Sequence, residues 1–317
     1  MQKTSNYTQV QLHTKQDLEQ ILLIYNKLNK LTKVDRLLAA DDISALHKIL
    51  LDGIRIQNNI DIQNIIFQII SFITSNGIDP QPFYSMFQNT YFSVTSIPDA
   101  FSTYETAHAV CSGKNVALNM DIVTFDENGF LTGRLIDESG LMKQIITHEL
   151  LHRISAFRED KEFKFTIDSA FSEGFTDLFA EIITKYDGPI KSEPYQFSKN
   201  VCDMLISMIG LKEAFNDYLN DFANYKNLKV LLQKYNLNFK EFETIFDKLL
   251  SMRYKVGENL ANINDAIKFE NDFLIEIRDK LIIPFIRDNP DKEEEIINKF
   301  NKLFADRGIT INLVKKM

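Results

Sequence analysis

The chain has 317 residues, which is enough to bury a large core, and its 11 glycines and 7 prolines are too few for a flexible repeat or a disordered chain. Its 36 basic and 44 acidic residues give a net charge of −8, which argues against nucleic acid as a partner, because a phosphate-binding surface needs an excess of basic side chains. The two cysteines, Cys111 and Cys202, form no CxxC pair, so the sequence favours a reducing compartment.

The first eighty residues predict a helical lobe. Apolar residues recur at helical spacing over residues 18–28, over 43–50 behind a cap at Asp42, and again over 60–74. The start of the sequence lacks the cationic residues and apolar run of a secretory signal, so we expect a cytoplasmic protein, or one exported by a route that needs no N-terminal signal peptide. The longest apolar run, 65–74, is too short to cross a bilayer, and we expect no membrane span.

Between about residues 82 and 136 the pattern becomes that of a small sheet. β-branched and aromatic residues gather in TYFSVT and in VALNMDIVTF, and the segments SIP and CSGKN indicate turns. Asn128 and Gly129, between two apolar runs, predict a tight hairpin. Asp137 and Ser139 can then cap a helix that runs from about residue 141 to 157.

After residue 188 nearly all of the sequence predicts helices again. One apolar stripe stops at Gly210, and the last helix begins at Asn289-Pro290 and ends at Gly308. We therefore expect three parts that pack together: an N-terminal helical lobe (1–80), a core with the sheet and two motif helices (81–188), and a C-terminal helical lobe (189–317). The expected fold class is α+β, mostly helical.

The segment ITHELLHRIS, residues 146–155, places two histidines one helical turn apart. A step of four residues turns about 400° on a helix, so His148 and His152 project from one face and can bind one metal ion. Glu149 is poorly directed to be a ligand, but it could take a proton from a zinc-bound water and pass it to a leaving amine. This is the chemistry of peptide hydrolysis. The competing interpretation is an ordinary solvated helix face.

A catalytic zinc ion needs three protein ligands and one open position, so the third ligand has to come from another segment. The segment AFSEGFTDLFAE, residues 170–181, predicts a second helix, capped near Asp168 or Ser169, and it supplies Glu173. Asp177 lies one turn further on and is placed to accept a hydrogen bond from the other ring nitrogen of His148.

Further features of this second helix bear on the site. Gly174 has no side chain, which would let the helix approach the HELLH helix closely. Glu181 continues the spacing of Glu173 and Asp177 and is a lower-ranked alternative as the ligand. The opposite face can pack into the core through Phe171, Phe175, Leu178 and Phe179.

The motif HELLH (148–152) followed by EGFTD (173–177) resembles the HExxH and ExxxD pair of the gluzincin, or thermolysin-like, zinc metallopeptidases. The resemblance covers about residues 115–185. It implies that His148, His152 and Glu173 bind one catalytic Zn²⁺, that Glu149 is the general base and acid, and that Asp177 orients His148. It also implies a zincin-like fold with a small mixed sheet, an active-site helix and a helical second lobe.

Some positions depart from the family or are left open by it. The family has Asn just before its glutamate ligand, where this chain has Ser172, whose hydroxyl could also support His152. The family's sheet presents an edge strand to the substrate, and residues 116–121 are our candidate; an ordinary paired strand is the alternative. The sequence has no GxMxN motif of the aminopeptidase branch, which favours an endopeptidase.

The transition state of peptide hydrolysis also needs a donor for its oxyanion. Tyr195, at the start of the next predicted helix, is our candidate, with Tyr186 and His108 as fallbacks. The alternative for Tyr195 is a half-buried aromatic residue at a helix start.

The leading hypothesis is a zinc metalloendopeptidase that acts on peptide or protein substrates. One alternative is a bacterial effector or toxin protease that acts on a specific host protein, bound through the helical lobes. Another is a zincin-shaped binding protein, although such a protein would not need the general base Glu149.

Overall fold

The computed structural model describes residues 60–88, 90–95, 109–112, 115–119, 124–125, 131–132, 140–155, 169–186, 193–220, 225–257 and 260–312. The chain divides into two compact units, Met1–Phe163 with Ala180–Gly188 and Lys164–Phe179 with Pro189–Met317. The helices that we predicted before residue 60 lie outside the described residues. The division into three parts therefore stays a prediction.

The first unit contains three described helices, which are α4 (Ile60–Ser75), α5 (Gln81–Gln88) and α7 (Leu141–Ser155). α4 buries one face through residues at helical spacing, Ile65, Ile69 and Ile73. It ends where the sequence indicated, because Gly77 adopts a left-handed conformation with φ 73° and its N–H bonds to a carbonyl of the last turn. α4 and α5 both contact α7.

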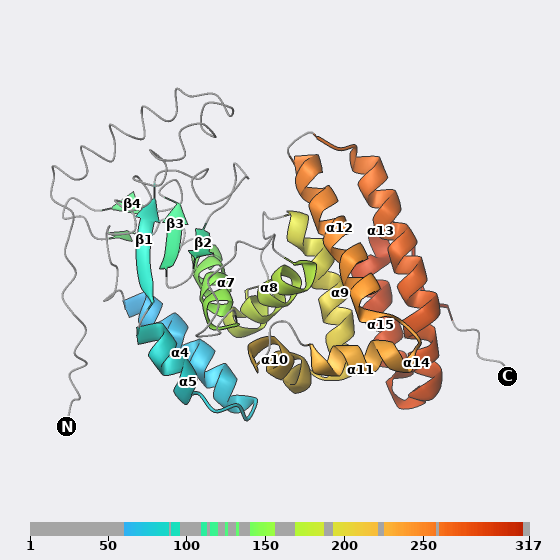
Figure 1. Cartoon of the computed structure of the whole chain (residues 1–317), viewed down its shortest axis with the longest axis horizontal. Helices are drawn as coiled ribbons and strands as arrows, with labels where there is room; N and C mark the ends of the chain where they lie inside the picture. Colours follow the sequence, from blue (N-terminus) through green and yellow to red (C-terminus); the bar gives the residue numbers. More distant parts are fainter. Residues whose placement is uncertain are drawn as a thin grey trace. The chain divides into compact units, whose positions relative to one another are not determined.

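The described strands of this unit are short. They are β1 (Tyr91–Thr95), β2 (Ala109–Ser112), β3 (Asn115–Asn119), β4 (Thr124–Phe125) and β5 (Leu131–Thr132). β3 pairs parallel with β1 and antiparallel with β2, which gives the order β1-β3-β2 visible in Figure 1. Ser112 pairs with Asn115, so the chain reverses at the turn that CSGKN indicated. β4 pairs with β5, but the predicted Asn128-Gly129 turn lies outside the described residues.

The predicted fold class needs correction. Helices account for 83% of the residues that determine the fold, and the short strands are not among them. The strands above are backbone pairings of two to five residues, and side chains are described only for Ala109, Cys111 and Val116 among them. Residues 81–88, at the start of the segment expected to form the sheet, form the helix α5 instead, and the short strands after it bury little apolar surface compared with helices. The fold is therefore mainly helical, and the α+β zincin-like class with a small mixed sheet is wrong.

A second correction concerns the strand expected to face the substrate. Residues 115–119 form β3, which has a neighbour on each side, so it offers no free edge along the candidate segment. β2 lies at an edge of the described three-stranded sheet and is a strand that contacts α7. Chain order placed residues 116–121 near the motif helix, but the β2–β3 hairpin, not chain order, decides which strand is outermost.

The second unit is a set of packed helices. They are α8 (Ala170–Thr184, of which residues 170–179 belong to this unit), α9 (Glu193–Ile209), α10 (Leu211–Asn220), α11 (Lys226–Lys234), α12 (Phe239–Gly257), α13 (Ile263–Ile277), η3 (Arg278–Ile282), α14 (Ile283–Asp288), η4 (Pro290–Lys292), α15 (Glu293–Phe304) and η5 (Ala305–Arg307). α9 contacts α10, α11, α12 and α15 (Figure 1). The predicted helix stops are confirmed, since Gly210 and Gly308 both have positive φ.

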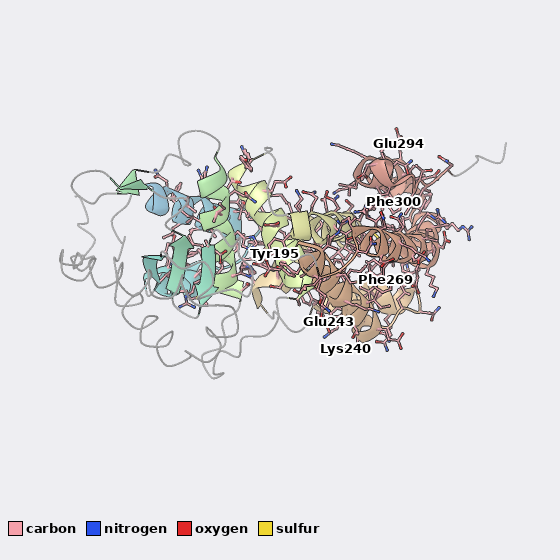
Figure 2. The ribbon with its side chains drawn as sticks, turned by 90° about the horizontal axis from the view of Figure 1, so that it is seen from above. Tyr195, Lys240, Glu243, Phe269, Glu294 and Phe300 are labelled. Atoms are coloured by element: carbon pink, nitrogen blue, oxygen red, sulfur yellow. The ribbon has the colours of Figure 1, made fainter. Side chains whose placement is uncertain are left out.

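Two kinds of contact stabilise this unit. Aromatic rings of α8 and α12, together with Tyr225 just before α11, form a buried cluster around Phe171, whose ring centroid lies 4.9–5.7 Å from those of Tyr225, Phe242 and Phe246. Glu270 of α13 is fully buried, and its carboxylate accepts hydrogen bonds from Arg253 and Arg307. An exposed ion pair, Lys240 with Glu243, lies at the start of α12 (Figure 2).

Among the helices described, none combines the length and the apolar character that crossing a membrane requires.

Candidate metal centre

The two histidines of the HELLH motif lie on α7, so the predicted helix is confirmed. α7 begins after Gly140, which has φ 65° and whose carbonyl accepts the N–H of Gln144. The predicted caps Asp137 and Ser139 lie outside the described residues. Only 9% of His148 is exposed and His152 is half-buried, so neither histidine lies on an ordinary solvated helix face.

The imidazole rings of His148 and His152 face each other through their Nε2 atoms. These atoms are 2.9 Å apart, and the ring centroids are 4.6 Å apart with the planes inclined by 73°. Two histidines bound to one tetrahedral zinc ion, with Zn–N of about 2.05 Å, would hold these nitrogens about 3.3 Å apart. The rings therefore need to separate by only a few tenths of an ångström to bind an ion. The same distance also fits a direct hydrogen bond between two neutral imidazoles.

Glu173 joins these histidines. One ligand atom from each of His148, His152 and Glu173 lies within 4.8 Å of the other two. Among the described residues, these three form a group that could hold a metal ion. Glu173 is 2% exposed, and burying a carboxylate is costly unless a cation or hydrogen bonds compensate for the lost water. Two imidazole nitrogens and one carboxylate oxygen are a donor set that catalytic zinc uses, so the residues fit the ion.

The position of Glu173 follows from the start of α8. Ser169 caps this helix, because its hydroxyl accepts the N–H of Ser172 at 3.0 Å. The N–H of Glu173 donates to the carbonyl of Ser169, so Glu173 lies in the first helical turn. A carboxylate is favoured there by the partial positive charge of the helix N-terminus. The sequence therefore predicted both this helix and its cap correctly.

The general-base candidate, Glu149, lies in a buried environment with two residues that the sequence did not single out. It is 8% exposed. Burial raises the pKa of the Cys111 thiol, the charge of Glu149 raises it further, and Arg153 opposes both effects. Burial also lowers the pKa of Arg153. The thiol of Cys111 on β2 therefore lies in the electrostatic field of Glu149 and Arg153. The four-residue step from Glu149 to Arg153, which places both on one face of the helix, was the feature of the sequence that could have indicated this pair.

The residues expected to support the ligands are buried on α8. Asp177 and Ser172 are both 5% exposed, and the carbonyl of Ser172 accepts a hydrogen bond from Thr176. The predicted roles of Asp177 in orienting His148 and of Ser172 in supporting His152 stay predictions. The metal-binding group contains Glu173 and not Glu181.

The sequence misassigned the neighbour of Gly174. A Cβ atom placed on Gly174 would lie 2.7 Å from Sγ of Cys202 and 2.8 Å from the backbone C and O of Ser198. Gly174 therefore permits a close approach of α9, and its role toward the HELLH helix is wrong. The spacing of the sequence identified a helix face without a side chain, but it could not identify which helix covers that face.

The candidate oxyanion donor, Tyr195, lies in the first turn of α9 and is half-buried (Figure 2). Its hydroxyl accepts a hydrogen bond from the hydroxyl of Tyr254 on α12, and the two rings meet edge to face with centroids 5.8 Å apart. Its role as oxyanion donor stays a prediction. Of the fallbacks, Tyr186 packs against Gly140, and His108 lies outside the described residues.

Comparisons with protein-family models, with curated proteins and with solved structures gave no match to this chain. The resemblance to the gluzincins rests on the two motifs alone, of whose residues His148, His152 and Glu173 make up the group described above.

Proposed function

We propose that this chain is a zinc-dependent metallopeptidase that cleaves peptide bonds within peptide or protein substrates. The observation that carries the proposal is the grouping of His148, His152 and Glu173, with Glu149 next to the first of them on the same helix. Two nitrogens, one oxygen and an adjacent carboxylate that is not a ligand are the parts that metal-assisted peptide hydrolysis needs.

Zinc, when bound, would acidify a water molecule and polarise the carbonyl of the peptide bond. Glu149 then accepts the proton of the attacking water and delivers it to the amine that leaves. Because Glu149 is 8% exposed, this carboxylate exchanges its proton with the substrate's groups in an environment that largely excludes bulk water.

The orientation of the histidines supports these roles. Their Nε2 atoms face each other, so these are the nitrogens that would bind the metal, which would leave the Nδ1 atoms for supporting hydrogen bonds. Asp177, buried one helical turn after Glu173, is the proposed acceptor for Nδ1–H of His148. Such a bond fixes the tautomer that leaves the Nε2 lone pair available.

The test compares the wild type with Glu149→Gln in two measurements, the bound zinc and the new protein N-termini formed in a cell lysate. We expect about one equivalent of zinc in both proteins, and a loss of cleavage by at least about a hundredfold in the variant, as removal of a general base typically causes. Glu181→Gln is the matched control, because Glu181 is a half-buried carboxylate of α8, the helix that carries Glu173, and lies outside the metal-binding group.

Two results would overturn the proposal. One is a wild-type protein with less than about half an equivalent of tightly held zinc at neutral pH, which would leave the 2.9 Å contact as a metal-free histidine pair. The other is cleavage by Glu149→Gln at the rate of the wild type.

A further inference from the structure

The first turn of α8, which carries Glu173, is held by a residue from a distant part of the second unit. The backbone N–H of Ala170 donates to Oδ1 of Asp247 on α12 at 2.8 Å, across a separation of 77 residues. We propose that Asp247 is a positioning residue, which fixes the first turn of α8 so that Glu173 stays in place as a metal ligand. This inference rests on the metal centre of the proposed function.

The position of Glu173 makes the cap important. The first N–H groups of a helix have no partner within the helix, and helix ends open more readily than helix centres. In α8 the side chain of Ser169 satisfies Ser172, and Asp247 satisfies Ala170. Glu173 is the residue after Ser172, so the position of this ligand depends on the first helical turn, which these two hydrogen bonds stabilise.

Aromatic residues of α12, the helix that carries Asp247, also contact the first turn of α8. The ring of Phe171 lies 5.7 Å from that of Phe242 and 4.9 Å from that of Phe246, the residue before Asp247. The rings keep α8 against α12, but stacked rings can slide and rotate. The hydrogen bond from Ala170 has a defined direction, so the carboxylate sets the position of the turn along and around its axis.

The charged form of the Asp247 carboxylate is disfavoured by its surroundings. Burial raises the pKa of Asp247, and the nearby Glu243 raises it further, while the bond from Ala170 lowers it. An apolar residue at this half-buried position would carry no such cost. A polar group retained in such a place is consistent with a positional role.

The second unit offers a matched control, because Asp217 caps α11 in the same way. Its carboxylate accepts the N–H groups of Asn227 at 2.7 Å and of Leu228 at 3.4 Å. α11 carries none of the candidate site residues. Loss of the Asp217 cap should therefore loosen a helix end without moving a metal ligand.

The experiment measures zinc affinity by competition with a chromophoric chelator, together with the melting temperature of each full-length protein. For Asp247→Ala we expect zinc affinity to fall by at least about tenfold, the usual effect of removing a residue that supports a metal ligand. For Asp217→Ala we expect a similar fall in melting temperature but unchanged zinc affinity. Asp247→Asn should restore zinc affinity, because its amide oxygen can still accept the N–H of Ala170.

The outcomes separate the inference from the proposed function. If wild type binds zinc and Asp247→Ala binds it equally well, or if Asp217→Ala weakens zinc as much, the positioning role is wrong. Should Asp247→Ala fail to fold, Asp247→Leu takes its place, since it fills the site but accepts no hydrogen bond, and it must show the same loss. A wild type without zinc overturns both proposals. Zinc binding without proteolysis overturns only the peptidase.

Discussion

The close approach of α8 and α9 at Gly174 can be tested without reference to function, through the variant Gly174→Ala. The added methyl group would lie 2.7 Å from Sγ of Cys202 and 2.8 Å from the backbone C and O of Ser198. Non-bonded carbon atoms normally stay about 3.5–4.0 Å apart, so the methyl group is about 0.7 Å or more too close. Two of the three atoms belong to the backbone of α9, which cannot turn aside as a side chain can.

Two effects oppose each other in this variant. Overpacking a filled core costs about 1–3 kcal/mol, and the backbone contacts place this site at the upper end. Alanine in place of glycine within a helix returns about 1 kcal/mol. The net expectation is a loss of about 2 kcal/mol in the free energy of unfolding. For a folding unit of roughly 150 residues this corresponds to a melting temperature lower by about 4–8 °C.

Thermal melting followed by circular dichroism, with urea denaturation as a second measurement, gives both quantities. Cys202→Ala in the Gly174→Ala background removes the contact with Sγ but not those with Ser198, so it should restore only part of the loss. A Gly174→Ala protein that melts at or above the wild-type temperature would mean that helix propensity alone operates. The described packing of α9 on α8 would then be incorrect.

Three other predictions follow from the contacts described. Glu270→Ala leaves Arg253 and Arg307 partly buried without their shared carboxylate, so urea denaturation should show a free energy of unfolding lower by about 3–5 kcal/mol. Lys240→Ala, in the exposed pair with Glu243, should lower it by less than about 1 kcal/mol. Equal losses in the two variants would refute the burial argument. Burial is the largest effect on the Asp217 carboxyl and raises its pKa, so ionisation costs the folded state more than the unfolded state. The protonated carboxyl therefore favours the folded state, and this stabilisation is lost as pH rises through the folded pKa. The melting temperature of wild type minus that of Asp217→Asn should be larger at about pH 4.5 than at about pH 7.5. A melting-temperature difference that is constant or reversed would contradict the raised pKa. Removal of zinc with a chelator should lower the melting temperature by several degrees, because an ion present at about 100 times its Kd adds about 2.7 kcal/mol, whereas Glu173→Gln should respond much less.

The sequence by itself determined the features that depend on residues within one or two helical turns of each other. The HELLH helix, the helix of Glu173 with its Ser169 cap, and the helix stops at Gly210 and Gly308 are all present. Each is set by side-chain periodicity, by a hydroxyl three residues from the N–H it accepts, or by a glycine that can adopt positive φ. Such short-range causes are visible in the order of the residues.

Only the tertiary structure decided which distant segments meet. It placed α9, and not the HELLH helix, against Gly174, made β3 the central strand, and brought Asp247 to the start of α8. It also corrected the fold class to mainly helical. These features depend on packing and hydrogen bonds between residues up to 77 positions apart, and no local pattern encodes the partner of an uncovered helix face or an open cap.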